Sequence, residues 1–382
     1  MSKSRLLIAF PGIWLLLLAV LLLLLFWQLR NLVLVLLISI VVAATLGPIV
    51  DGLERLRIPR WLAVIVLYLL LIAGLTGAGL IIGPAVITQI QRLTLQLPSY
   101  LEELRLLVAG ATARFGVAEP GLFDQLVDTQ ALTGWLIRSS QQLLIRSVGL
   151  TRGLVGSLVN LLLVLVVSGY MLAGSKVLIQ GLVMLFPYPW NKRLEEQMTP
   201  MSQRMGGYIQ GRIVVSGILG IAITLGLRFL GLWEFALALG VIAGFTNLIP
   251  FVGPVLGALP ALVVAIAQGG WVFIWVLLLF VVLQNVETYV LDPLLVGSSV
   301  NVHPLYQLLG VLAGTQILGI IGALIVPPWV AGGAVLLENL YLRPKLAEES
   351  LLDQPQQMST DHGEVAAPMP TAAASSDPSH PP

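Results

Sequence analysis

The sequence predicts an all-α polytopic membrane protein, because it is short of charge, contains apolar runs of bilayer length, and has two uncharged stretches broken by glycine and proline. Of its 382 residues, 57% are hydrophobic and only 10% are charged. A soluble domain carries about a quarter charged residues, since its surface must face water. The charges here are too few to cover a globule, so lipid must act as the solvent for much of the surface.

The composition also excludes several kinds of site. A net charge of +1 provides no basic surface for the phosphates of nucleic acid, so no nucleic-acid partner is expected. The absence of cysteine excludes disulfides and thiolate metal sites. Two of the three histidines, His362 and His380, lie in a polar tail, so neither a metal centre nor another cofactor is expected.

Motifs of membrane-embedded enzymes and of ATP-driven pumps are missing from the sequence. It has neither a His-Glu-x-x-His zinc motif nor a Gly-x-x-x-x-Gly-Lys-[Ser/Thr] phosphate loop. A two-aspartate protease needs paired aspartates inside the membrane, and only Asp292 falls near membrane depth. We therefore expect no enzymatic activity and no direct use of ATP.

Charged residues divide the N-terminal region into apolar runs. Residues 11–28, 31–50 and 61–83 each approach the ~20 residues that cross a ~30 Å hydrocarbon layer, which predicts a three-span segment over 1–83. The first run exceeds the roughly 7–15-residue core of a cleaved signal peptide, so we expect it to remain as an anchor. Over 84–150, apolar residues recur at helical spacing among charged ones, which predicts amphipathic helices divided at Pro98 and again near residue 120.

Residues 151–346 are predicted to form a membrane transport core. The runs 154–173, 208–230 and 271–291 are apolar enough to span, and a polar connector over 174–207 separates the first two. Glycines in 208–230 predict close helix packing, and Gly-x-x-x-Gly spacings offer contact surfaces for a homo-oligomer. These spacings are Gly79/Gly83, Gly149/Gly153, Gly240/Gly244, Gly253/Gly257 and Gly310/Gly314.

The distribution of Lys and Arg sets the expected orientation. Basic residues precede the first run, follow the second run at 55–60, and recur in the 174–207 connector. These positions fall on one side if the spans alternate, and the positive-inside rule makes that side cytoplasmic. We therefore expect cytoplasmic N- and C-termini and an extracytoplasmic 84–150 segment. The tail, 347–382, is rich in Pro, Ser, Ala and Asp without periodicity and is expected to be disordered.

Two long uncharged stretches must turn within the chain's membrane region. No charge occurs between Glu234 and Glu287, a length far beyond the ~20 residues of one span. The segment Asn247-Leu248-Ile249-Pro250-Phe251-Val252-Gly253-Pro254 cannot sustain regular helix, because each proline removes a backbone donor. The second stretch, 293–337, has glycines in its middle and a Pro-Pro pair later.

Two arrangements fit these breaks. Residues 234–267 and 305–341 can each form a re-entrant hairpin, or each break can be an ordinary kink or loop in a scheme of eight spans. The matched pair of broken segments favours the hairpins, within a total of six to eight membrane-spanning helices. Broken helices of this kind build substrate sites in transporters.

The candidate transport path lies around these breaks. Glu287 is the first candidate, because an acid at membrane depth is costly and usually faces a cavity or a partner. We expect this carboxylate to couple transport to protons or cations, and the alternative is a structural role as a helix cap or in an ion pair. Asp292 precedes Pro293 and, on an α-helix, would face a different side from Glu287 unless the helix is broken there. His303 offers either a proton shuttle or a simple turn.

Uncharged residues complete the candidate set. Asn247 can offer its amide to a ligand or to backbone groups freed by the break. The break itself is formed by Pro250, Gly253 and Pro254. A polar path, or hydrogen bonds between helices, can be supplied by Gln284, Asn285, Gln307 and Gln316.

Four motifs occur in a specific order and spacing: Asn247 to Pro254, Glu287 to Gly297, His303-Pro304-Leu305, and Gly319-Ile320-Ile321-Gly322 followed by Pro327. Together they resemble the autoinducer-2 exporter family of bacterial membrane proteins. The resemblance implies an oligomeric, permease-like protein of the bacterial plasma (inner) membrane. Some members are linked to export of the furanone signal autoinducer-2 and others to cation–proton exchange.

The chain departs from the family pattern near its acidic residues. Pro293 is followed by Leu294 and Leu295, where many relatives place a basic residue, and Asp292 stands where glutamate is more usual. A basic partner for Glu287 is therefore not supplied locally.

These observations lead to a functional hypothesis. We expect a secondary transporter or exporter of a small polar or amphiphilic solute, autoinducer-2-like or coupled to protons or cations. The alternative is a passive channel or a membrane scaffold without transport activity. The expected partners are membrane lipid, a small-molecule substrate, protons or cations, and further copies of the chain.

Overall fold

The computed structural model describes residues 4–115, 158–297, 304–346 and 348–349. Within these residues it contains helices and no strand, which confirms the all-α class. Five helices are long and apolar enough to cross a membrane, or six if one bent pair counts as a span, which confirms a polytopic membrane protein. Residues 1–334 form one unit and residues 335–382 a second. In the second unit, the π-helical segment η3 (Glu338–Leu342) precedes Arg343, which pairs with Glu338 at 3.0 Å.

Two long helices stand where the sequence predicts three spans and separate amphipathic helices. Helix α1 runs from Ser4 to Arg55 and α2 from Arg60 to Phe115. The charge and amide at positions 30 and 31 end an apolar run but do not break a helix, because neither residue removes a backbone donor. Helix α2 likewise continues through Pro84 and Pro98, so the predicted division at Pro98 is wrong. The rest of the predicted 84–150 segment, from residue 116, lies outside the described residues.

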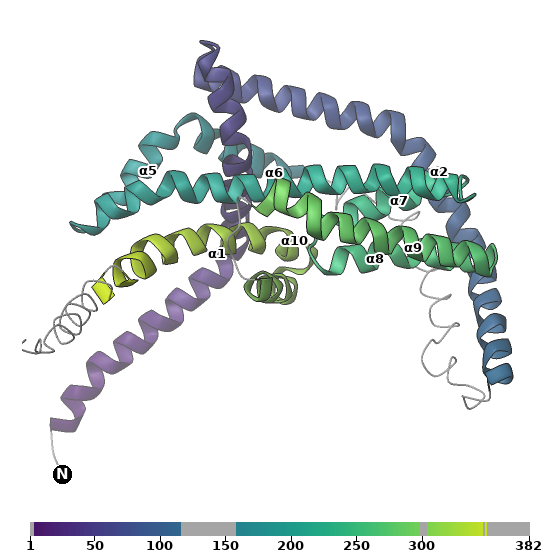
Figure 1. Cartoon of the computed structure of the whole chain (residues 1–382). Helices are drawn as coiled ribbons and strands as arrows, with labels where there is room; N and C mark the ends of the chain where they lie inside the picture. Colours follow the sequence, from purple (N-terminus) through teal and green to yellow (C-terminus); the bar gives the residue numbers. More distant parts are fainter. Residues whose placement is uncertain (1–3, 116–157, 298–303, 347, 350–382) are drawn as a thin grey trace, which may run out of the picture. The chain divides into compact units, whose positions relative to one another are not determined.

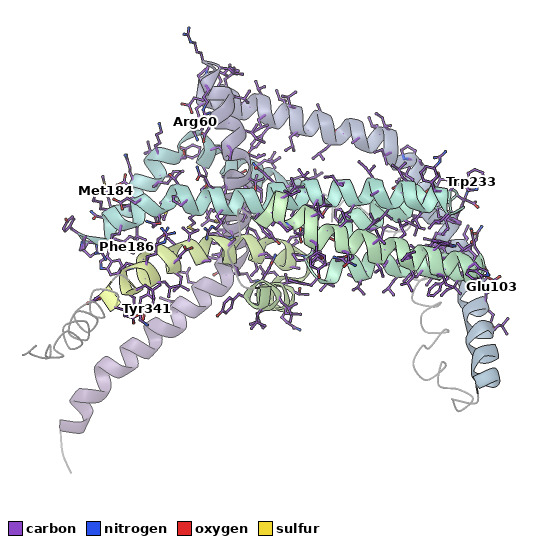
Figure 2. The ribbon with its side chains drawn as sticks, viewed as in Figure 1. Arg60, Glu103, Met184, Phe186, Trp233 and Tyr341 are labelled. Atoms are coloured by element: carbon purple, nitrogen blue, oxygen red, sulfur yellow. The ribbon has the colours of Figure 1, made fainter. Side chains whose placement is uncertain are left out.

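A charged corner joins α1 to α2. Arg60 Nη1 pairs with Asp51 Oδ1 at 2.9 Å and with Glu54 Oε2 at 2.8 Å, and its Nε donates to the carbonyl oxygen of Leu172 at 2.7 Å. Figure 2 places Arg60 at this corner. The contact to Leu172 ties the corner to the helix Leu158–Ala173.

The predicted polar connector, 174–207, is largely helical. The helix Leu158–Ala173 is followed, after a bend of 84°, by α5 (Ser175–Val183). Helix α6 then begins at Trp190 and continues to Phe229, which includes the predicted span 208–230 almost whole.

The first Gly/Pro-broken segment forms a helical hairpin, whose arms are α7 (Ala236–Thr246) and α8 (Val252–Ala267). At its turn, Phe251 adopts a left-handed φ of 64°. The arms pack so closely that a Cβ on Gly257 would lie 2.7 Å from the Cα of Ala243. The 11 residues of α7 reach only ~16 Å, too short for a ~30 Å layer, which favours the re-entrant arrangement over eight full spans.

The second broken segment also folds back on itself. Helix α10 (Pro304–Leu337) contains Gly319 in a non-helical conformation, with φ 63° and ψ −147°. On either side of it the backbones nearly touch, since a Cβ on Gly322 would lie 2.0 Å from the carbonyl oxygen of Gly314. Residues 304–334 therefore form a second hairpin and not one straight apolar helix.

Between the hairpins in the chain lies a helix that changes type. Helix α9 (Gly270–Val286) leads directly into a π-helical segment, η1 (Glu287–Val296). Helix α6 packs along α7, α9 and η1, and α8 packs against α9 (Figure 1). A buried apolar cluster holds the first hairpin among α2, α6 and α9, and its members include Leu93, Leu227, Leu239, Val264 and Val276.

Most of the Gly-x-x-x-Gly spacings are used inside the chain. Gly240 and Gly244 pack against Gly220 of α6, which confirms close helix packing there. The pairs Gly253/Gly257 and Gly310/Gly314 serve the two hairpins. At Gly79 and Gly83 nothing lies within 4 Å of an added Cβ, and Gly149/Gly153 fall outside the described residues.

Candidate functional site

A buried ion pair lies where α6 meets η1. Glu287, the first residue of η1, is 2% exposed, and Arg212 of α6 is 6% exposed. Arg212 Nη1 donates to Glu287 Oε1 at 2.8 Å, across 75 residues of sequence. Taking two charges out of water is costly, and removing one partner of such a pair leaves an uncompensated buried charge. The pair therefore depends on both members.

The turn of the first hairpin completes this pair. Asn247, which is 3% exposed, donates from Nδ2 to Glu287 Oε1 at 3.0 Å and accepts at Oδ1 from Arg212 Nη2 at 3.4 Å. The two bonds fix the amide in one orientation, since its NH₂ faces the acid and its oxygen faces the arginine. The amide serves the charged pair in this structure, a use that differs from the two considered from sequence.

Asp292 joins the same cluster from one π-turn further along. Its Oδ1 lies 3.6 Å from Arg212 Nη1. On an α-helix, residues i and i+5 are rotated by roughly 140° from each other, whereas the i→i+5 bonding of a π-helix brings them to the same side. Pro293 cannot donate to the carbonyl four residues before it and would collide with it, which explains the wider turn. The π-helix thus aims both carboxylates at one arginine.

The cluster contains more acid than base. Arg212 faces two carboxylates, so one negative charge is uncompensated when both acids are ionised. Arg212 Nε, Asp292 Oδ1 and Ser216 Oγ are buried and make no hydrogen bond to any other part of the chain that the structure describes.

The two acids differ in their access to the surroundings. The Glu287 side chain is 3% exposed, whereas that of Asp292 is 39% exposed. Asp292 therefore connects the buried pair to the exposed face of η1.

Tyr208, one turn before Arg212 on α6, links the site to the second hairpin. It is 2% exposed, and its hydroxyl accepts a hydrogen bond from Gln307 Nε2 at 3.1 Å. Tyr208 also packs with Val215, Leu219 and Val296 in a buried cluster between α6 and η1. Helix α6 thus holds the charged residue and, one turn away, a contact to the second hairpin.

The other predicted site residues that the structure describes make no hydrogen bond or ion pair with Arg212 or Glu287. At the first turn, Pro250 and Gly253 are buried and Pro254 is half-buried. In α9, Gln284 is half-buried and Asn285 is exposed, donating to the carbonyl of Val281 in its own helix at 2.7 Å. Gln316 is exposed on the second hairpin. His303 lies outside the described residues.

Arg212 is the residue that the motif analysis missed. Its signal was present in the sequence, because it stands inside the predicted span 208–230. A cation at that depth is expensive and must find a partner. It supplies the base that the sequence after Pro293 lacks, from a helix far away in the chain.

Comparison with known proteins relates the chain to a family of transporters. The family described as AI-2E family transporter matches residues 16–341. The chain is similar to a protein named "Putative transport protein YrrI" from Bacillus subtilis, with 28% identity over 315 residues, which cover 80% of this chain and 86% of that protein. It is also similar to "Putative transport protein YueF" from the same organism, with 26% identity over 81% of this chain and 84% of that protein. A third relative, "Putative transport protein MT0215" from Mycobacterium tuberculosis, is 28% identical over 77% of this chain and 79% of its own length.

Proposed function

The chain belongs to the AI-2E transporter family, and from this premise we propose that it is a secondary transporter of a small polar or amphiphilic solute, driven by protonation of its buried cluster. The observation that carries the proposal is a pair of carboxylates, Glu287 and Asp292, that share one arginine beside the turn of a broken helix. An ionisable group at membrane depth that faces the interior of a bundle marks an ion or proton pathway.

The proposed coupling follows from the charge balance. With one proton bound, the cluster of Arg212, Glu287 and Asp292 is neutral, and without it the cluster carries one negative charge. Asn247 bonds directly to Glu287, so a change in that carboxylate alters what holds the turn of the first hairpin. Protonation and solute movement are thereby linked through the hairpin, and the ion gradient supplies the energy.

The nature of the solute, the membrane and the assembly also belong to the proposal. We propose an autoinducer-2-like solute, the bacterial plasma membrane and an assembly of several copies, with cytoplasmic termini. The orientation is supported by basic residues at 55–60 and 174–193, which fall on one side if α2 and the helix Leu158–Ala173 each cross the membrane. Reporter fusions at each terminus test the orientation, including the side on which the long α1 begins.

The decisive variant is Glu287→Gln, which keeps the size and polarity of the side chain but removes its charge. In proteoliposomes, the variant is expected to insert and assemble normally while its solute flux no longer responds to a pH gradient. Glu195→Gln serves as the control, because Glu195 is an exposed acid on α6, the helix that carries Arg212. Flux of Glu287→Gln that follows the pH gradient as the parent does would remove this carboxylate from the mechanism.

The same vesicles separate the proposal from its alternatives. A transporter gives saturable flux that follows the coupling ion, whereas a channel passes a current that follows the membrane potential. A scaffold gives neither flux nor current.

A further inference from the structure

The segment 174–193, which we call the elbow, begins with α5, which meets the helix Leu158–Ala173 at a bend of 84° at Gly174. The two helices reach the length and hydropathy of a span only as a pair, so the bend marks either a broken span or the point where α5 turns into the plane of the membrane. The exposed apolar and cationic side chains of the elbow favour the second arrangement. Short amphipathic helices in that position bury their apolar face at the boundary between headgroups and acyl chains.

The elbow exposes an almost continuous apolar face. Val177 is 74% exposed, Met184 78%, Leu185 79% and Tyr188 80%. Met184 and Phe186 project from the end of α5, at the turn towards α6 (Figure 2). The turn continues into Tyr188 and Trp190, and these two residue types are enriched at the level of lipid headgroups. Water alone is a poor solvent for this face.

Cations flank the apolar face. Lys176 and Lys192 are exposed, and neither makes an ion pair with any residue in the described ranges. The Arg193 guanidinium lies over the Trp190 ring, 5.8 Å from its centroid, so the cation is held beside the aromatic group. The acids that follow on α6, Glu195 and Glu196, lie one turn further along the helix than Lys192 and Arg193. Basic residues next to exposed Tyr and Trp side chains suit the headgroup level of an anionic membrane surface.

We propose that the elbow is a docking surface for anionic phospholipid, with Val177, Met184 and Leu185 in the acyl boundary and Lys176, Lys192 and Arg193 at the headgroup phosphates. The inference is independent of the transported solute, because no residue of the elbow belongs to the charged cluster at Arg212. The elbow meets α6 at its first residues, and Arg228 lies at the other end of that helix. Its occupant is a lipid surface, since the exposed face is continuous with a spanning helix and carries the charge that anionic headgroups complement.

The absence of cysteine makes the depth of the elbow measurable. Single cysteines introduced by Leu185→Cys and, as a control, Glu195→Cys can carry a spin label in the full chain, because both side chains are exposed. Gln180 is unsuitable as a control, because it lies between Val177 and Met184 on one face of α5. In phosphatidylglycerol vesicles, the label at 185 is expected to collide with dissolved oxygen and the label at 195 with a water-soluble nickel chelate. Equal access of the chelate to both labels overturns the proposal. So does a label at 185 that is shielded from both reagents and crosslinks to a second copy, because that assigns the face to a subunit contact.

The lipid charge is tested with a fluorescent label on the same cysteine. Brominated phosphatidylglycerol is expected to quench it at lower mole fraction than brominated phosphatidylcholine, by about fivefold for each cation that takes part. Replacing Lys176, Lys192 and Arg193 by glutamine should abolish this preference, whereas Arg228→Gln, at the far end of α6, should leave it unchanged. A preference that survives the triple replacement, or equal quenching by both lipids in the parent, overturns the anionic site.

Discussion

The hairpin α7–α8 and the hairpin at residues 304–334 both turn at a glycine- or proline-rich break, and both bring their arms together until backbones touch. A Cβ would lie 2.0 Å from a carbonyl oxygen at Gly253 in the first hairpin and at Gly322 in the second. Their chemistry differs. The first places Asn247 on a buried ion pair, whereas residues 304–334 contain no charged side chain and reach α6 through the bond from Gln307 to Tyr208.

This difference teaches that a broken helix does not by itself make a site. Both breaks are visible in the sequence, yet only the first contacts the charged cluster. Asn247 at its turn bonds to Arg212 and Glu287, whereas Gln307 of the second hairpin bonds to Tyr208, one turn before Arg212. The second hairpin is the matched internal comparison for the first. Variants that affect one hairpin and spare the other measure how far the distinction holds.

The largest effect is expected for Arg212→Met, which leaves Glu287 buried without its cation. Breaking a buried pair in this way costs roughly 3–5 kcal/mol, and thermal unfolding in detergent should reveal it. The double variant Arg212→Met/Glu287→Gln should recover much of the loss, because it removes the orphaned charge. Arg228→Met, an exposed arginine on the same helix, is the control. Equal stability of Arg212→Met and the parent would mean that the pair does not hold α6 to η1.

Next in size are Gly253→Ala and Gly322→Ala, which force a methyl group against backbone in each hairpin. Overpacking of this kind costs about 1–3 kcal/mol, and we expect similar losses of thermal stability for both. Only Gly253→Ala should also change the pH dependence of transport, because its turn carries Asn247. Gly217→Ala, with nothing within 4 Å, should be neutral or slightly stabilising. Identical transport defects in the two hairpin variants would erase the functional distinction between them.

A smaller effect is expected for Tyr208→Phe, which removes the hydroxyl that accepts from Gln307. The loss of one buried hydrogen bond costs about 1 kcal/mol. A double-mutant cycle with Gln307→Ala, followed by thermal unfolding, should give a coupling energy of that size. Tyr289→Phe changes an exposed tyrosine and is the control. Additive effects of the two variants would show that the second hairpin is not held to α6 by this bond.

The smallest effect is expected for Gln316→Ala on the second hairpin. Its side chain is exposed, and surface substitutions usually change stability by less than about 0.5 kcal/mol. Transport measured across a range of solute concentrations should also match the parent. A raised KM would place this hairpin on the solute path and weaken the contrast with Asn247.

The sequence predicted some parts of the site well and others poorly. It located both helix breaks and singled out Glu287, Asp292 and Asn247, because proline, glycine and buried charge have strong local consequences. It predicted that Glu287 and Asp292 lie on different faces of an α-helix unless the helix is broken at Pro293, and a π-helical segment through Pro293 brings them to one side. It did not identify Arg212, because the partner of Arg212 is 75 residues away and a local sequence pattern does not show which distant segments come into contact.

The division between what the chain fixes locally and what folding decides has a physical basis. Composition by itself determined a helical membrane protein, because so few charges cannot cover a water-soluble surface. Local backbone chemistry indicated the breaks near Pro250 and at Gly319, although α2 continues through Pro84 and Pro98. Only tertiary packing decided which arginine pairs with which acids. It also decided which glycines pack inside the hairpins and which of the two hairpins contacts charged residues. Those contacts join segments distant in sequence, and their energies depend on burial and geometry that no local pattern contains.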